Sequence, residues 1–190
     1  MLIRRVFAVL LALAILVVVV GFFLPRVSVV QRSLVIDQPA ENIFRVLQDF
    51  RHFPQWSPWF ERVPEAGFRL EGPSGGVGST VVWSDEGGSG DGRLWITSVT
   101  PPRRVELRME LGETETAGFF LIEPAASGGE RVTWGLRVEA ASFDLVGRYM
   151  SLLLPGLVGP EYARGLERLA SYLERHEGVP PVPAGEASDA

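Results

Sequence analysis

Two stretches of this chain alternate between apolar and polar residues, and no other feature of the sequence restricts the fold as strongly. Across residues 104–111 and 131–140 every second side chain is apolar, and most of the side chains between them are charged. Successive side chains of a β-strand point to opposite faces of a sheet, so each stretch is expected to be a strand with one buried and one solvated face. That pattern is typical of an antiparallel sheet.

Five further segments have the composition of strands. They are residues 27–36, 68–71, 78–84, 93–99 and 117–123. Turn signals, most of them rich in glycine and proline, separate the later segments from one another. The chain is therefore expected to form a sheet of about seven strands.

Two helices are expected to accompany the sheet. Residues 38–41 are typical of a helix start, because proline is favoured at the first helical position. Residues 161–176 form a second helix with one narrow apolar stripe. The stripe contains Tyr162, Leu166, Leu169 and Leu173. Because sheet and helix each have an apolar face to cover, we expect an α+β fold in which a curved antiparallel sheet wraps around the long C-terminal helix.

The N-terminus carries an uncharged apolar run of 19 residues, from residue 6 to residue 24. A helix that crosses the hydrocarbon core of a membrane needs about 20 residues. A secretory signal peptide usually has a shorter apolar region, of about 7–15 residues, before a small-x-small cleavage site. Here the run ends in Gly-Phe-Phe-Leu-Pro without such a site. We therefore expect an uncleaved transmembrane anchor.

This interpretation divides the chain into three parts. They are an anchor over residues 1–25, one folded domain over 26–177, and a disordered tail over 178–190 that is rich in proline and small or acidic residues. Arg4 and Arg5 precede the span, which favours a cytoplasmic N-terminus. The predicted localisation is the cell membrane, as a single-pass protein with its domain on the non-cytoplasmic (periplasmic or extracellular) side.

Composition excludes several classes of site. The chain has no cysteine, and none of its 18 basic residues is lysine. Disulfides, thiolate nucleophiles, iron–sulfur clusters and lysine Schiff bases are therefore excluded. Beyond the anchor, 16 arginines stand against 23 acidic residues. A domain with that charge and without a basic cluster is a poor partner for nucleic acid.

Several segments resemble one protein family, in the same order along the chain. They are residues 35–44 (VIDQPAENIF), 49–59 (DFRHFPQWSPW), Gly72-Pro73, 76–78 (GVG), Trp83, 132–134 (VTW) and 165–169 (GLERL). Together they resemble the START-like, or helix-grip, superfamily (SRPBCC), which includes plant pollen allergens and lipid-transfer domains. Within it they resemble the polyketide cyclase/dehydrase and lipid transport group. The resemblance covers nearly all of residues 30–177.

The resemblance implies a helix-grip fold with a hydrophobic cavity between the curved sheet and the C-terminal helix. Loops and the short helices after the first strand would close the mouth of that cavity. A bent sheet and a single helix cannot interdigitate everywhere, so an apolar void can remain between them. Since the superfamily includes carriers, receptors and enzymes, the resemblance specifies the fold more sharply than the function.

Eight residues are candidates for the lining of this cavity. They are Trp56, Trp59, Trp83, Phe119, Val132, Trp134, Leu136 and Leu166. Trp56 and Trp59 lie in a segment interrupted by prolines, where they form either an aromatic gate at the mouth or a hydrophobic plug under the end of the sheet. Trp134 is expected to face inward, as part of either the core or the cavity lining.

No catalytic residue, metal ligand or cofactor site is expected. His52 lies three residues after Asp49, but a histidine near the end of a helix is more simply explained by the helix dipole and by capping. A general base would need a position in the cavity and a partner. His176, the other histidine, lies on a different predicted helix, so the pair has no metal-ligand spacing.

Residues 143–158 are unusually apolar, with Asp144 and Arg148 as their only charges. Two interpretations stay open. In the first, the segment belongs to the fold, either buried against the end of the sheet or as a lid over the cavity. In the second, it contacts a bilayer through which an apolar ligand could enter. Its glycines and prolines argue against a single rigid helix.

These observations predict a membrane-anchored domain that binds or shuttles a hydrophobic or amphipathic small molecule or lipid, without a cofactor. The sequence identifies no protein partner. An enzyme of the polyketide cyclase/dehydrase type is the alternative, and it requires a titratable group inside the cavity. A ligand-free interaction domain is a third possibility, and it requires that no sizeable cavity exists.

Overall fold

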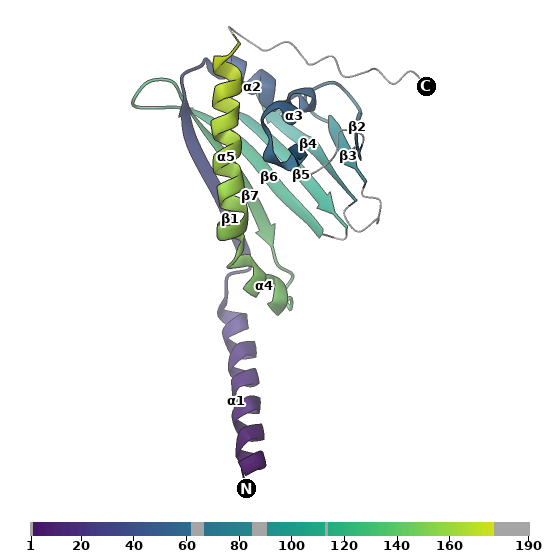
Figure 1. The fold of residues 1–190 in the computed structure, drawn as a ribbon, viewed down its shortest axis with the longest axis vertical. Helices are drawn as coiled ribbons and strands as arrows, with labels where there is room; N and C mark the ends of the chain where they lie inside the picture. The colour runs from purple at the N-terminus through teal and green to yellow at the C-terminus, as the bar shows by residue number, and fades with distance from the viewer. Residues whose placement is uncertain (1, 62–66, 85–90, 113, 177–190) are drawn as a thin grey trace.

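The computed structural model describes residues 2–61, 67–84, 91–112 and 114–176. Within them a seven-stranded antiparallel sheet curves around one long helix, and a separate apolar helix extends from the domain as a stalk (Figure 1). The predicted tail, residues 178–190, lies outside the described residues.

All seven segments predicted as strands form the sheet. In spatial order they are β1 (Val27–Ile36), β7 (Glu130–Glu139), β6 (Thr114–Pro124), β5 (Arg104–Leu111), β4 (Gly92–Thr100), β3 (Thr80–Trp83) and β2 (Phe68–Glu71). Every neighbouring pair is antiparallel. The first and last strands of the sequence therefore pair with each other, and the prediction of a curved antiparallel sheet is confirmed.

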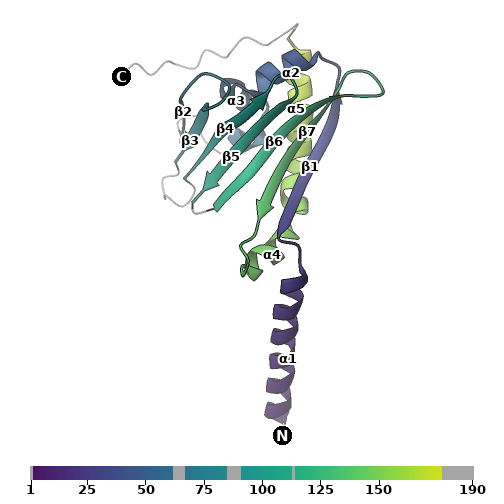
Figure 2. The ribbon, with the colours of Figure 1, turned by 180° about the vertical axis from the view of Figure 1, so that it is seen from behind.

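The helices of the domain gather on one face of this sheet. After β1 come α2 (Ala40–Leu47), η1 (Phe50–His52), α3 (Phe53–Trp56) and η2 (Pro58–Glu61). The long α5 (Leu154–Glu174) runs along the concave face, and Figure 2 shows the sheet from behind, with these helices on its far side. The fold is the helix-grip fold that the sequence predicts.

The alternation of the strands sets which side chains enter the core. On β5, Val105 and Leu107 are buried on the concave face. Arg104 and Glu106 lie on the opposite face, where their side chains form an ion pair of 2.9 Å. Since one face of β5 packs against α2 and the other meets solvent, this strand is apolar on one side only, as the sequence indicates.

The last helix is longer than predicted. α5 begins at Leu154 instead of near residue 161, because Pro155 lies in its first turn, where backbone N–H groups have no helical acceptor and proline costs little. Pro160 lies further inside the same helix. The apolar segment 143–158 thus forms a short helix, α4 (Leu145–Ser151), and the start of α5. It forms two helices, in keeping with the prediction that it is not a single rigid one.

The N-terminal helix α1 (Leu2–Phe23) stands apart from the core. Its residues Ile3–Phe23 are long and apolar enough to cross a membrane, and almost none of them is covered by the rest of the protein. The end of α1 lies next to α4 and the beginning of β1 (Figure 1).

Candidate ligand-binding cavity

An apolar cavity of about 260 Å³ lies between the concave face of the sheet, the η2 segment and α5. Its lining consists of Phe53, Ser57, Trp59, Phe60, Phe68, Trp83, Leu94, Leu107, Met109, Gly118, Trp134, Leu136 and Tyr162. None of these residues carries a charged side chain, and only Ser57 and Tyr162 carry a hydroxyl group. The cavity therefore offers a large apolar surface with few polar contacts.

One wall of the cavity is aromatic. The Trp134 ring, from the middle of β7, stacks on the Tyr162 ring of α5 with centroids 4.2 Å apart and an interplanar angle of 8°. Gly165 permits this approach of helix to sheet, because a Cβ at that position would lie 2.5 Å from an atom of the Trp134 ring. The stacked pair joins α5 to the sheet and forms part of the cavity wall.

Four of the eight predicted residues line this cavity: Trp59, Trp83, Trp134 and Leu136. Three others, Trp56, Val132 and Leu166, lie in the adjacent core and are almost completely buried. Trp56 packs edge-on against the Trp134 ring, with centroids 5.4 Å apart. Of the two interpretations of Trp56, its position corresponds to the hydrophobic plug.

The structure places Phe119 on the other face of the sheet. Gly118 lines the cavity and Phe120 is buried in the core, so the residue between them on β6 must point outward. The guanidinium carbon of Arg104 lies 5.6 Å from the centre of the Phe119 ring on that outer face. Phe119 therefore cannot contact a ligand in this cavity.

The eight residues predicted from the sequence do not include several that line the cavity. Leu107 and Met109 belong to the apolar face of β5, and Tyr162 belongs to the apolar stripe of the last helix. Both patterns are visible in the sequence and could have identified these three residues. Phe53 and Phe60 come from the aromatic segment around Trp56, where no periodicity shows which rings reach the cavity.

One of the described lining residues, Ser57, has a buried polar atom without a partner. The Ser57 Oγ atom is buried and has no hydrogen-bond partner in the described part of the chain. A buried hydroxyl left unpaired costs about 1–3 kcal/mol. Burial also raises the pKa of Tyr162 well above its usual range, so its hydroxyl stays protonated and can act as a donor. These two hydroxyl groups are the candidates for binding a polar group of a ligand.

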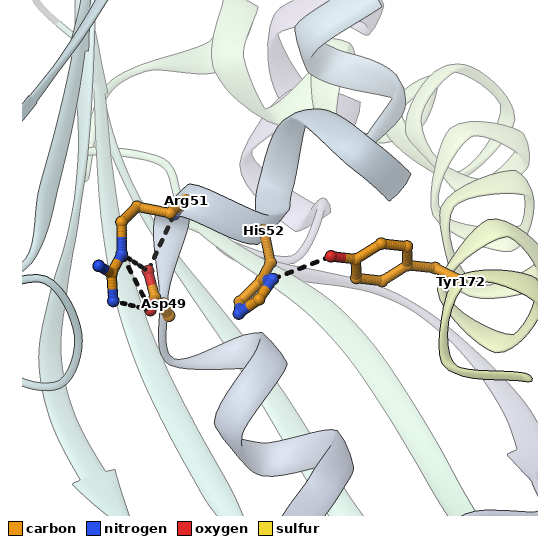
Figure 3. Close-up of polar contacts among 4 residues, drawn as sticks. All are labelled: Asp49, Arg51, His52 and Tyr172. Atoms are coloured by element: carbon orange, nitrogen blue, oxygen red, sulfur yellow. Dashed lines mark hydrogen bonds and ion pairs between the residues drawn. The ribbon is translucent and has the colours of Figure 1, made fainter. Parts of the chain in front are cut away.

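The residues around His52 form a separate polar cluster (Figure 3). The His52 Nδ1 atom lies 3.0 Å from the Tyr172 hydroxyl of α5, and the ring is 2% exposed. The Asp49 carboxylate caps η1 by accepting a hydrogen bond of 3.0 Å from the Arg51 backbone N–H, and it also pairs with the Arg51 guanidinium. Burial lowers the pKa of His52, although the Asp49 charge opposes this effect.

This cluster connects η1 to α5 and contributes no residue to the cavity lining. Its imidazole is buried in a hydrogen bond with a tyrosine, which fits a structural role better than the helix-end capping predicted from the sequence. Among the described residues, no group of three His, Asp or Glu side chains could hold a metal ion. Among the described lining residues, Tyr162 is the one titratable side chain.

The family and the solved structures that this chain resembles agree with the fold described above. The sequence profile of the family described as "Polyketide cyclase / dehydrase and lipid transport" matches residues 28–174. Among curated proteins no sequence matches.

Solved structures that resemble this chain share its fold at low sequence identity. Norcoclaurine synthase from Thalictrum flavum, in complex with dopamine and hydroxybenzaldehyde, superposes with a TM-score of 0.59 at 15% identity. The match covers 84% of this chain and 93% of that one. A protein from Rhizobium leguminosarum gives 0.54 at 18% identity, with 79% and 96% covered. A protein from Rhodobacter sphaeroides gives 0.54 at 15% identity, with 79% and 94% covered.

Proposed function

Because the chain belongs to the polyketide cyclase / dehydrase and lipid transport family, we propose that its cavity binds a hydrophobic or amphipathic small molecule, which the domain carries at a membrane. The family and the fold support a hydrophobic ligand-binding domain. The observation that carries the proposal is the apolar cavity, whose lining includes Ser57, a residue with a buried hydroxyl that has no partner in the described part of the chain. A ligand that fills the cavity and hydrogen-bonds to Ser57 would satisfy both features.

The size of the cavity favours a small ligand. Its volume of about 260 Å³ lies just below the range of typical small-molecule sites, which span roughly 300–1,000 Å³. One ring system or a single short acyl chain suits that space better than a diacyl lipid does. Norcoclaurine synthase, which shares the fold, is known in complex with dopamine and hydroxybenzaldehyde, two small aromatic compounds.

The chemistry of the lining supports binding over proton transfer. A general acid or base needs a pKa near the working pH. In the part of the lining that the structure describes, the one titratable residue is Tyr162, whose raised pKa holds it in the neutral form. Affinity would come from apolar area removed from water, at about 25 cal/mol per Å². The hydroxyl groups of Ser57 and Tyr162 would add selectivity.

We also propose that residues 1–25 anchor the domain on the non-cytoplasmic side of the cell membrane. The support is the apolar helix α1, with Arg4 and Arg5 before its span. Cell fractionation should find the full-length mass in the membrane fraction, resistant to carbonate extraction. A soluble product that begins near residue 26 would rule out the anchor.

Ligand binding is tested with the full-length protein in lipid nanodiscs, titrated with N-phenyl-1-naphthylamine, a small uncharged dye that brightens in apolar surroundings. The proposal predicts saturable binding above the signal of empty nanodiscs. It also predicts a change in tryptophan emission, because Trp59, Trp83 and Trp134 line the cavity. A signal no larger than that of empty nanodiscs at every dye concentration would refute the proposed cavity function.

A further inference from the structure

Six large apolar side chains lie exposed together at the end of the domain from which α1 extends. They are Phe143, Val146, Met150, Leu152, Leu153 and Leu157, which we call the apolar collar. Phe143 is 84% and Val146 74% exposed. A soluble surface rarely gathers exposed apolar residues in this way without a partner. None of the six residues lines the cavity, so the collar is not its lid.

The collar segment presents a single charge to its surroundings, the exposed carboxylate of Asp144. Asp144 caps α4 by accepting a hydrogen bond of 2.7 Å from the Gly147 backbone N–H. Arg148, the only other charged residue in this segment, is 5% exposed. Its guanidinium turns inward and donates to the backbone carbonyls of Phe22 (2.9 Å) and Ser142 (2.8 Å). Of the two charges of the segment, only that of Arg148 is used inside the fold; Asp144 stays at the surface, and the other side chains of the outer surface are mostly apolar.

Direct contacts attach α4, which carries Val146 and Met150 of the collar, to the end of α1. Arg148 also donates to the Gly21 and Leu24 carbonyls, so it satisfies acceptors that the end of a helix leaves open. The Tyr149 hydroxyl donates to the Val17 carbonyl at 2.7 Å. Gly21 lies against Tyr149 and Leu145, so α4 packs closely on this part of α1. Figure 1 shows α4 beside the upper end of α1.

These contacts fix the depth of α4 relative to α1. At about 1.5 Å per residue, the 19 uncharged residues 6–24 reach roughly 28 Å, close to the ~30 Å hydrocarbon core of a bilayer. Val17 lies seven residues before Leu24, which places it on the order of 10 Å below that end of the span. A helix that touches Val17 cannot stand above a membrane that α1 crosses.

We propose that the apolar collar is inserted into the interfacial layer of the bilayer on the side of the domain, with lipid as the partner that covers it. This inference rests on the proposed anchor, and it adds a second membrane contact on a different part of the chain. The six exposed apolar side chains and the position of α4 beside Val17 and Gly21 both fit a helix lying 5–10 Å deep in the interface, roughly the depth of known interfacial helices, where the Asp144 carboxylate can reach the polar headgroups.

The collar would hold the cavity close to the membrane. Leu136, which lines the cavity, pairs with Val30, and Val30 lies six residues after Leu24. At about 3.3 Å per residue of strand, this part of the cavity lies within roughly 20 Å of the end of the span. A ligand of low solubility could then pass between bilayer and cavity over a short path.

The absence of cysteine in the native chain allows a direct test by single-cysteine labelling. Val146→Cys and Leu153→Cys are each labelled with bimane in the full-length protein, reconstituted into phosphatidylcholine vesicles that contain acyl-chain nitroxide lipid. Val35→Cys is the matched control, because Val35 is also an exposed apolar residue but lies near the far end of β1. Leu13→Cys reports on the span of α1.

The proposal predicts at least twofold quenching at residues 146, 153 and 13, and less than about 10% quenching at residue 35. Quenching at residue 13 with none at 146 or 153 would overturn the collar and leave the anchor intact. If residue 13 is also unquenched, the proposed anchor is wrong, and so is the proposed insertion of the collar, which depends on it. Blue-shifted but unquenched emission at 146 and 153 would indicate a protein surface over the collar and would likewise overturn the proposal.

Discussion

A leucine at position 118 would fill the cavity from the sheet side. Gly118 lies on the concave face of β6 and is one of the cavity-lining residues. A Cβ placed there would lie 3.5 Å from the Leu107 Cβ and 3.6 Å from the Gly135 carbonyl oxygen, which are ordinary van der Waals contacts. The backbone at this position also needs no glycine, because Gly118 does not have a positive φ. Gly118→Leu is therefore expected to fold.

The effect on binding follows from the volume that the new side chain takes up. A leucine side chain in the cavity takes the place of ligand atoms. The ligand then loses apolar contact worth about as much as the burial of one leucine side chain, roughly 1.5–3 kcal/mol of binding free energy. At about 1.4 kcal/mol per factor of ten, the dissociation constant should rise roughly 10–150-fold. The free energy of unfolding should not fall, because glycine inside a strand costs roughly 0.5–1 kcal/mol relative to alanine.

The assay is titration with N-phenyl-1-naphthylamine in nanodiscs, together with thermal unfolding of each variant. Ala117→Leu is the control, because Ala117 is the next residue on β6 and points to the outer face. It should leave the dissociation constant within twofold of the native value. A Gly118→Leu protein that melts like the native chain and binds the dye as tightly would refute the assignment of the cavity as the binding site.

Three further predictions concern single side chains. Ser57→Ala should raise the free energy of unfolding by about 1 kcal/mol, because it removes a buried hydroxyl without a described partner. The same change should weaken binding of 4-hydroxybenzaldehyde but not of the dye. A fall in the free energy of unfolding would show that the Ser57 hydroxyl is already paired. In denaturant titrations, Leu107→Asp should cost several kcal/mol, because it buries a carboxylate in the apolar face. Arg108→Asp should cost about 1 kcal/mol or less, since Arg108 is half exposed and loses only a surface ion pair; equal losses for the two would reverse the assignment of the faces. Because burial lowers the pKa of His52 in the folded state, the unfolded chain binds more protons below its ordinary value of about 6.5. The free energy of unfolding should therefore be highest above that pH and fall as the pH drops toward the lower pKa of the folded state, with a smaller fall in His52→Gln. Dye affinity should stay constant between pH 6 and 8. The same pH dependence of the free energy of unfolding in the native chain and the variant would contradict a buried, neutral His52.

The alternation of apolar and polar residues predicted an antiparallel sheet with one buried face. Across 104–111 the period of two shows which side chains face the core, and the stripe of Tyr162 and Leu166 shows which side of the last helix meets them. Both features depend on the local geometry of one element, so a sequence alone contains them. The start of α5 at Leu154 was missed because proline within a helix is normally read as its boundary, although the first turn tolerates it.

The cavity lining was harder to predict because it depends on how three elements meet. Trp56 and Trp59 are three residues apart in the same aromatic segment, yet only Trp59 reaches the cavity while Trp56 is packed under the sheet. The turn between α3 and η2 decides this difference, and no periodicity describes it. For Phe119 the signal was present, because its neighbour Phe120 is inward and the two must face opposite sides.

Mass spectrometry of small molecules released from the purified full-length protein tests the central claim most directly. If the cavity binds a hydrophobic or amphipathic ligand, denaturation of the native protein should release one such compound in an amount close to that of the protein. Gly118→Leu, purified in the same way, should release at least tenfold less, while lipids that adhere to α1 or to the collar should be equal in both samples. The same compounds in equal amounts from the two proteins would contradict the account, because the cavity would then play no part in their binding.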